Sequence, residues 1–235
     1  MYKSNSLIIG GTRGIGLVIK DKLISRGDLV FTASRSTIAE SNHFSIDLPN
    51  LDGIDENIKF NYLIFTHRYR GNDWDEEFNI SVKYIDLLIN KLRDRFSAEA
   101  SIVILGSSAG RFVVTEQSAA YHSTRAALEG LMKFYAVSLG YKGIRCNLVL
   151  PSTVIKPENE NFFNEENEIR KMIELITPLR RMGSAGDIAN IVEFLCSEKS
   201  NFITGQSFLI DGGLSIRGQE SIAREYISRK TTNSK

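Results

Sequence analysis

The chain has 235 residues, of which 42% are hydrophobic and 24% are charged. This composition is typical of one globular domain and excludes low-complexity, collagen-like and generally disordered chains. The formal charge is only +1, so no strong electrostatic field favours nucleic acid or an anionic membrane as the partner. No apolar run reaches the ~18 residues of a transmembrane helix, and the run Leu7–Ile9 is too short for a signal peptide.

Short apolar runs alternate along the chain with longer stretches of helical pattern. The runs have apolar residues at adjacent positions, which suits strands that are buried on both faces of a parallel sheet. This alternation predicts the α/β class: a single Rossmann-type doubly wound domain, with a seven-stranded parallel sheet and helices on both faces. The expected strands are Ser6–Ile9, Leu29–Thr32, His43–Ile46, Tyr62–Thr66, Ser101–Leu105, Arg145–Leu150 and Ser207–Ile210. The expected helices are Gly14–Ser25, Asp75–Phe96, Ala119–Gly140 and Asp187–Cys196.

Two segments do not follow this alternation. Residues 152–178 are expected to form a substrate lid, in which the acidic, Asn-rich stretch Lys156–Lys171 is a mobile loop and short helix over a site. A solvated surface helix is the alternative. We assign residues 1–213 to the domain and residues 214–235 to a polar tail. The tail is expected to be disordered, with a helix over Glu220–Ile227 as the alternative.

The two cysteines and three histidines give no metal or redox motif. Cys146 and Cys196 form no C-x-x-C pair, and the histidines have no H-E-x-x-H spacing. We interpret both cysteines as buried small hydrophobic residues in a reducing compartment, and expect a cytoplasmic protein without a metal site.

A glycine-rich loop follows the first expected strand and opens the first expected helix. Glycines let the backbone turn sharply and approach a pyrophosphate, and the helix N-terminus offers free N–H groups with a partial positive charge. The spacing G-x-x-x-G-x-G is neither G-x-G-x-x-G nor a P-loop. We therefore predict a dinucleotide site that includes Gly10, Thr12, Arg13, Gly14, Ile15 and Gly16.

Residues after the second and third expected strands complete the adenosine end of this site. The residue just past the second strand meets the adenosine ribose, where an acidic residue binds the 2′-OH and an arginine pairs with a 2′-phosphate. Arg35, preceded by Ser34, has this position, and Arg13 can reach the same phosphate. We therefore predict NADP(H) in preference to NAD(H), the alternative being two solvated arginines. Asp47 and Leu48 are expected to contact the adenine ring.

Three stretches resemble the short-chain dehydrogenases/reductases. The glycine loop is similar to T-G-x-x-x-G-[IL]-G, with Ile9 in place of the Thr. Gly143–Pro151 resembles the G-I-R-x-N-x-x-x-P-G stretch, and Ile203–Gly213 resembles I-T-G-Q…D-G-G. The resemblance covers Leu7 to about Gly213 and points to the branch that contains 3-oxoacyl-carrier-protein reductases and many sugar and polyol dehydrogenases. Members are commonly homotetramers, so we expect a homodimer or homotetramer.

The resemblance implies that Asn, Ser, Tyr and Lys carry the chemistry. Asn79 fits the Asn, which holds a water and the helix geometry, and Tyr121 fits the proton donor. Ser107 fits the Ser that binds the carbonyl oxygen, while Ser108 stays open because the spacing to the Tyr is ambiguous by one residue. The motif is Y-x-x-x-K, and here Arg125 occupies the Lys position, where it is expected to bind the nicotinamide ribose.

Arg125 is expected to weaken this chemistry without abolishing it. Tyr121 and Arg125 lie one helical turn apart, and a permanent cation lowers the pKa of a phenol, which is ordinarily ~10. A guanidinium does not readily release and regain a proton, because its pKa exceeds ~12, so a proton relay should be impaired.

A second departure replaces the family's N-N-A-G by Phe65–Thr66–His67–Arg68. His67 and Arg68 are either structural substitutions without chemistry or, together with Arg70, bind an anionic part of a substrate. The short stretches on either side of this strand indicate that two peripheral helices are trimmed. The expected cofactor-binding set also includes Thr66, His67, Tyr121, Arg125, Pro151 and Val154.

The predicted function is an NADP(H)-dependent oxidoreductase that interconverts a carbonyl and a secondary alcohol by hydride transfer. The expected partner is a small-molecule substrate, sugar-derived or carrier-bound, with no nucleic acid and no membrane. One alternative is a non-catalytic NADP(H)-binding subunit, which Arg125 and the lost N-N-A-G favour. The other is dehydration or epimerisation on the same scaffold.

Overall fold

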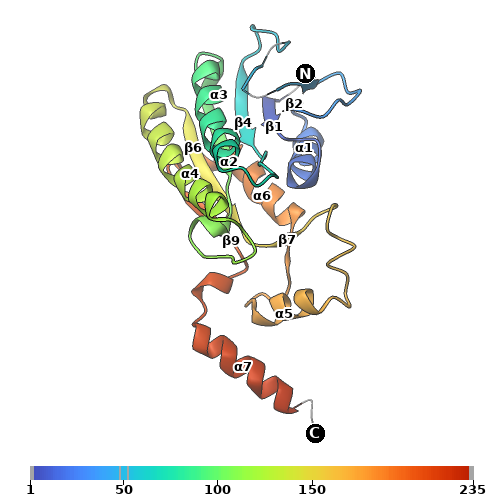
Figure 1. The fold of residues 1–235 in the computed structure, drawn as a ribbon. Coiled ribbons are helices and arrows are strands. Elements are labelled where there is room, and N and C mark those ends of the chain that lie inside the picture. The colour runs from blue at the N-terminus through green and yellow to red at the C-terminus, as the bar shows by residue number, and fades with distance from the viewer. Residues whose placement is uncertain (1–2, 48, 52, 233–235) are drawn as a thin grey trace.

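The computed structural model describes residues 3–47, 49–51 and 53–232. Within these residues, a seven-stranded sheet with parallel pairing has the strand order β3-β2-β1-β4-β5-β6-β9 (Figure 1). The expected α/β class and its seven-stranded parallel sheet are confirmed. The strands are β1 (Asn5–Ile9), β2 (Leu29–Ser34), β3 (His43–Ser45), β4 (Phe60–Phe65), β5 (Phe96–Leu105), β6 (Arg145–Pro151) and β9 (Ser207–Ile210).

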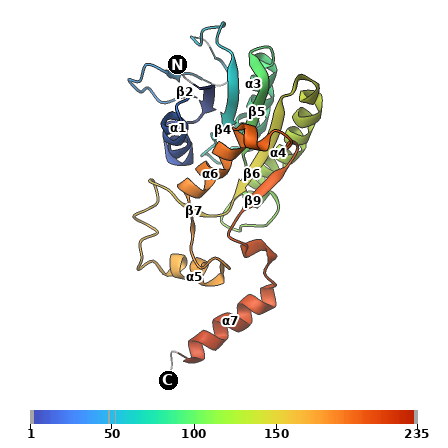
Figure 2. The same cartoon turned by 180° about the vertical axis from the view of Figure 1, so that it is seen from behind.

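Helices cover both faces of this sheet. Helices α1 (Gly14–Arg26) and α6 (Ala185–Leu195) lie on one face, and α3 (Tyr84–Leu92) and α4 (Ala119–Ser138) lie on the other (Figures 1 and 2). Successive strand residues point to opposite faces. In β1, Leu7 and Ile9 therefore pack in the core cluster of α3 and α4, whereas Ile8 packs in that of α1 and α6. Both clusters need apolar residues, which explains the uninterrupted apolar runs.

The helix expected over Asp75–Phe96 is interrupted in the structure. It consists of α2 (Trp74–Phe78), the π-helical turn η1 (Asn79–Lys83) and α3. In the π-helical turn, the N–H of Tyr84 bonds to the carbonyl of Asn79, one residue further back than in an α-helix. The π-helical turn therefore starts at Asn79, the residue that the sequence analysis expects to be the catalytic Asn.

The connections on either side of β4 are short. The described residues between β3 and β4 form turns and no helix, and α2 is the one helix described between β4 and η1. Phe96, expected at a helix end, instead begins β5, because it pairs with Phe60 of β4 before a bulge shifts the register.

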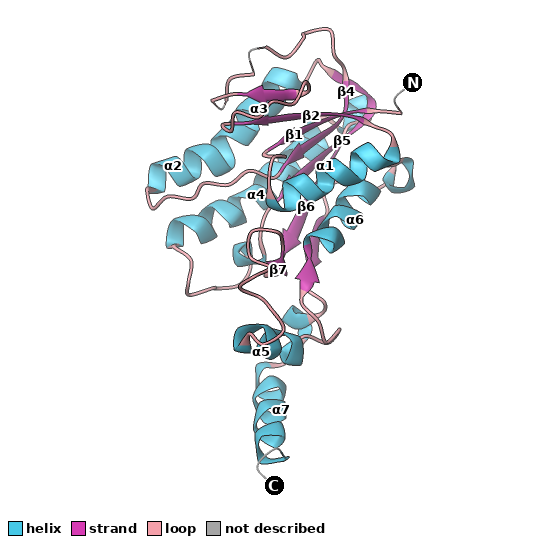
Figure 3. Ribbon diagram, turned by 90° about the vertical axis from the view of Figure 1, so that its right-hand side faces the viewer, coloured by secondary structure: helices cyan, strands magenta, loops and turns pink. Residues whose placement is uncertain are grey.

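The segment 152–178 lies beyond the carboxyl ends of the strands (Figure 3). It contains β7 (Val154–Ile155), which pairs with β8 (Gly183–Ser184), and helix α5 (Glu168–Ile176). Phe163 is buried and contacts Phe162, with ring centroids 4.8 Å apart.

The expectation of a disordered tail is wrong for its described part. Residues Gln219–Thr232 form helix α7, which projects from the body of the molecule (Figures 1 and 2). Glu225 ties this helix to the chain before it, because it accepts hydrogen bonds from Arg180 (2.8 Å) and Arg217 (2.7 Å). No helix in the described part of the chain is long and apolar enough to cross a membrane.

Candidate active site

A cavity of about 340 Å³ opens at the carboxyl ends of the central strands. Its walls come from the segments that follow β1, β2, β4, β5 and β6. The strand order reverses between β1 and β4, and ligands of open α/β sheets bind at such a point. Of the residues that the sequence assigns to the site, the cavity is lined by Gly10, Thr12, Arg13, Gly14, Ile15, Gly16, Ser34, Arg35, Thr66, His67, Ser107, Tyr121, Arg125, Pro151 and Val154.

Two assigned residues that the structure describes do not join this set. Asn79 does not line the cavity, although its neighbour Ile80 does. Asp47 is exposed and also does not line it, so the structure gives no support to an adenine contact there. Leu48 lies outside the described residues. The cavity also includes Lys156 and Glu158 of the lid segment, which sequence reasoning did not assign to the site.

The glycine loop packs directly on the end of β4. Gly10 has φ +93°, and a Cβ built on it would lie 2.8 Å from the backbone N of His67. A Cβ on Gly16 would lie 2.5 Å from Oγ1 of Thr66, whose hydroxyl donates to the carbonyl of Ile9 at 3.1 Å. Side chains would fill this cradle, so glycine keeps the backbone N–H groups at the start of α1 open to an anion.

Five cationic side chains line the cavity besides Arg125: Arg13, Arg35, Arg68, Arg70 and Lys156. None of the five forms an ion pair with another described residue. Burial lowers the pKa of Arg70 and of Lys156, and repulsion by the neighbouring arginines lowers both further. The cavity wall therefore has an excess of positive charge that suits a polyanion.

Tyr121 and Ser107 reach the cavity from the start of α4 and the end of β5. Ser118 caps α4 by accepting a hydrogen bond from the N–H of Tyr121 at 3.1 Å, which holds Tyr121 in the first turn. The Oγ of Ser107 accepts from the N–H of Ala109 at 3.2 Å, so its own O–H stays available as a donor. Ser108 lines the same cavity, and the choice between the two serines stays open.

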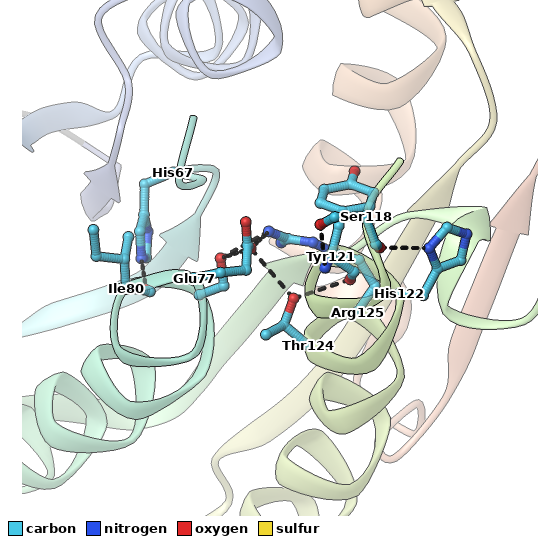
Figure 4. Close-up of polar contacts among 9 residues, drawn as sticks. His67, Glu77, Ile80, Ser118, Tyr121, His122, Thr124 and Arg125 are labelled. Carbon is cyan, nitrogen blue, oxygen red and sulfur yellow. Dashed lines mark hydrogen bonds and ion pairs between the residues drawn. The ribbon is translucent and has the colours of Figure 1, made fainter. Parts of the chain in front are cut away.

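The guanidinium of Arg125 is paired with Glu77 of α2 (Figure 4). Its Nη2 donates to Glu77 Oε1 at 2.9 Å and to Ser81 Oγ at 2.8 Å. Ser81 Oγ and Thr124 Oγ1 also donate to the same carboxylate oxygen, at 2.6 and 3.2 Å. Both charged side chains are buried, at 3% and 6% exposure, so Glu77 compensates the charge of Arg125 inside the protein.

The guanidinium also lies over the ring of Tyr121, 4.7 Å from its centroid. Sequence reasoning missed Glu77, which is the last acidic residue of the run Asp75–Glu77 and the one of them that is buried. The roles of Arg125 toward Tyr121 and toward a ribose stay predictions.

His67 lies beside this network. Its Nε2 is hydrogen-bonded to the carbonyl of Ile80 at 2.9 Å (Figure 4). Burial lowers the pKa of His67 to about 4, and the charges of Arg125 and Arg35 act in the same direction. The ring is therefore neutral at pH 7.

Comparison with known proteins establishes the family. A family model described as enoyl-(acyl carrier protein) reductase matches residues 45–215. The chain belongs to the short-chain dehydrogenases/reductases.

Among its relatives, an L-rhamnose 1-dehydrogenase (NAD(P)(+)) of Sphingomonas sp. (strain SKA58) is 36% identical over 117 residues, which are 50% of this chain and 46% of that protein. A tropinone reductase homolog of Arabidopsis thaliana is 33% identical over 122 residues, 52% of this chain and 45% of that protein. The chain thus spans about half the length of these relatives. The crystal structure of a short chain dehydrogenase family protein from Francisella tularensis subsp. tularensis SCHU S4 is 26% identical, with a TM-score of 0.78 over 91% of this chain and 99% of that one.

Proposed function

We propose that this protein is an NADP(H)-dependent oxidoreductase that interconverts a carbonyl group and a secondary alcohol. One observation carries the proposal: a single cavity combines a glycine cradle, five cations that form no ion pair with another described residue, and the hydroxyls of Ser107 and Tyr121. The family and the NAD(P)(+)-dependent rhamnose dehydrogenase support a nicotinamide cofactor.

The charge of the cavity favours the phosphorylated cofactor. NADP(H) carries about two more negative charges than NAD(H), because it has a 2′-phosphate. The N–H groups at Gly14 and the start of α1 would hold the diphosphate, and Arg13 and Arg35 would hold the 2′-phosphate. Arg68, Arg70 and Lys156 add positive charge in the same cavity, which Glu158 alone among its lining residues opposes.

The reaction needs one hydride and one proton. A nicotinamide held in this cavity would supply the hydride for the carbonyl carbon, or take one from the alcohol in the reverse direction. Tyr121 gives its phenolic proton to the carbonyl oxygen as the C=O π electrons move onto that oxygen, and it regains a proton from solvent. Ser107 donates its O–H to the same oxygen, and Ala109 holds the serine Oγ in place. The lid, residues 152–178, covers the substrate.

The pairing of Arg125 with Glu77 slows the return of the proton. A guanidinium stays protonated, and this one is held by Glu77 and Ser81, so it does not relay protons between Tyr121 and solvent. Arg125→Lys should therefore increase kcat for a carbonyl substrate. A variant no faster than the parent would contradict this part of the proposal.

The substrate is proposed to be a small carbonyl or alcohol compound, sugar-derived or carrier-bound. A homodimer or homotetramer is supported by three exposed apolar residues on and just after α4: Phe134, Val137 and Tyr141. Light scattering of the purified protein at several concentrations tests the assembly.

The first experiment is an equilibrium titration of the purified chain with NADPH and with NADH. We expect NADPH to bind about tenfold or more tightly, since a hydrogen-bonded charged phosphate adds at least ~1.5 kcal/mol. Equal affinities would contradict the NADP(H) preference, and absence of binding would contradict the function.

A panel of ketones, aldoses and alcohols then tests turnover. Tight NADPH binding without turnover of any substrate by the parent or Arg125→Lys would favour the non-catalytic alternative. The buried ion pair of Arg125 and Glu77 supports this non-catalytic alternative, because the paired guanidinium does not relay protons.

A further inference from the structure

The connection from β2 to β3 is short for two parallel strands. Such a crossover usually takes a dozen or more residues and contains a helix. Here only residues 35–42 separate Ser34 from His43, and these residues form no helix. Arg35 is the first residue of this loop, and it lines the cavity. Because no helix fixes the loop, the direction of Arg35 depends on the contacts that the loop makes.

The side chain of Arg35 is not held by a charged partner. It is exposed and forms no ion pair with another described residue. Burial lowers the pKa of His67, and the charge of Arg35 contributes in the same direction, so the guanidinium lies on the side of the cavity that faces His67. The backbone on either side of Arg35 must therefore set this direction.

Hydrogen bonds hold the backbone on both sides of Arg35. Before it, the carbonyl of Ser34 accepts from the N–H of Ile46 at 2.8 Å. After it, the N–H of Ser36 donates to Oγ of Ser34 at 3.2 Å, and the carbonyl of Ser36 is hydrogen-bonded to Nε2 of His43 at 2.7 Å. The first bond belongs to the end of the sheet and the second is local. The bond from His43 is the one in which a side chain reaches across the loop to the residue that follows Arg35.

The imidazole of His43 is itself fixed at both nitrogens. Its Nδ1 is hydrogen-bonded to Oγ1 of Thr32 at 2.8 Å, and Thr32 is the buried residue of β2 that pairs with His43 in the sheet. A carbonyl oxygen only accepts, so Nε2 carries a hydrogen and donates it to Ser36. The ring is thus a rigid strut between the buried hydroxyl of Thr32 and the backbone next to Arg35.

His43 makes these contacts from outside the cavity. Ser34, Arg35 and Ser36 line the cavity, whereas His43 and Thr32 do not. Any effect of His43 on a ligand must therefore pass through the turn at residues 34–36. The later part of the loop has a separate attachment, because Glu40 forms an ion pair with Lys20 of α1 at 3.0 Å.

We propose that His43 is a positioning residue for cofactor selectivity: its Nε2–H holds the carbonyl of Ser36, so that the turn at residues 34–36 presents Arg35 to the 2′-phosphate. This inference rests on the proposed function. A turn that is already ordered binds the phosphate without the cost of fixing the loop, which is the general advantage of preorganisation. An arginine after β2 then selects NADP(H) only while His43 holds its backbone.

Binding titrations with His43→Gln and His43→Asn test the contact with Ser36. Gln keeps an N–H donor close to the position of Nε2, whereas Asn reaches only the position of Nδ1 and keeps the bond to Thr32. The probes are 2′,5′-ADP and 5′-AMP, which differ in the 2′-phosphate alone. We expect His43→Asn to raise the Kd of 2′,5′-ADP about five- to tenfold and to leave that of 5′-AMP unchanged. His43→Gln should restore most of the loss, and unchanged 5′-AMP binding shows that the variants are folded.

Backbone ¹⁵N relaxation provides a readout that needs no ligand. The order parameters of the Arg35 and Ser36 N–H groups should be about 0.85 in the parent and in His43→Gln, and below about 0.6 in His43→Asn. Glu40→Gln is the matched control within the same loop, because it removes the charge that pairs with Lys20 and leaves the bond between His43 and Ser36 in place. It should change neither the order parameters nor the preference for 2′,5′-ADP.

The outcomes separate this proposal from the proposed function. If the parent binds 2′,5′-ADP no more tightly than 5′-AMP, the NADP(H) preference fails, and the order parameters alone then decide whether His43 holds the turn. Unchanged order parameters in His43→Asn would overturn the positioning role in either case. An equal loss of both probes, or a loss in His43→Gln as large as in His43→Asn, would also overturn it, because the bond to Ser36 would not be the cause.

Discussion

The carboxylate of Glu158 lies against the backbone of Gly14, the first residue of α1. A Cβ built on Gly14 would be 2.7 Å from Oε1 and 3.0 Å from Oε2 of Glu158. The start of a helix has a partial positive charge and free N–H groups, and Arg70 and Lys156 also interact with this carboxylate. A carboxylate of the lid segment therefore lies where we propose that the cofactor diphosphate binds, and the two anions compete for one site.

Replacement of Glu158 should consequently tighten cofactor binding. We expect Glu158→Gln to lower the Kd of NADPH about two- to fivefold, the equivalent of 0.5–1 kcal/mol for one charge near a helix N-terminus. The effect should shrink as ionic strength rises, because salt screens the competing charges. Glu160→Gln is the matched control, since Glu160 is exposed and does not line the cavity. Weaker NADPH binding by Glu158→Gln would instead make Glu158 a ligand of the cofactor.

Arg35 should discriminate between the two cofactors. We expect Arg35→Ala to raise the Kd of NADPH about tenfold and to leave that of NADH nearly unchanged, because only NADPH has the 2′-phosphate that pairs with the guanidinium. Isothermal titration with both cofactors measures the two changes. Arg93→Ala removes an exposed arginine at the end of α3 and should alter neither Kd. If Arg35→Ala weakens the binding of NADPH and of NADH equally, Arg35 contacts a part of the cofactor that both molecules share.

The sheet could be predicted because burial on both faces imposes a local pattern. The helix before β5 shows the limit of such patterns. Leu88, Leu92 and Phe96 recur every four residues, so the helical period continues through Phe96 although the chain has already entered β5. Pairing of Phe96 with Phe60 decides its structure, and this contact is not local. Helix α7, which the sequence offered only as the alternative to a disordered tail, is likewise held by a contact that is not local, since Arg180 and Glu225 are far apart in sequence.

In the candidate site, too, local sequence patterns predict some residues, whereas others depend on contacts between distant parts of the chain. Its glycine loop and Arg35 could be assigned from sequence because each has a fixed place relative to one strand. The partner of Arg125 could not be predicted from the sequence. Glu77 is 48 residues away, and its position in an acidic run at the start of a helix does not distinguish it from its neighbours. The acidic stretch 156–171 could be recognised from its composition, and its role as a lid stays a prediction. Its contact with Gly14 depends on how the chain returns to the sheet, which no local pattern specifies.

The pair of Glu77 and Arg125 should contribute strongly to stability. Removing one partner leaves the other charge buried and unpaired, which costs about 3–5 kcal/mol. We expect Glu77→Ala to lower the free energy of unfolding by this amount in urea denaturation. Glu129→Ala is the control: Glu129 pairs with Arg111 and Lys133 at the surface, and such pairs contribute at most about 1 kcal/mol. If the free energy of unfolding falls by a similar amount in the two variants, the buried pair is hydrated.

The pH dependence of stability should report the neutral state of His67. Its pKa is about 4 in the folded protein and ~6.5 in the unfolded chain, mainly because the ring is buried. Between these values the unfolded chain binds a proton that the folded protein does not, so stability falls as the pH drops from ~6.5 to about 4. The loss is at most about 3 kcal/mol, and it stops once the folded form is also protonated. Urea denaturation of the parent and His67→Phe across this range isolates the effect, since the other titrating groups contribute to both. Parallel curves would show that His67 is already protonated in the folded protein at pH 6.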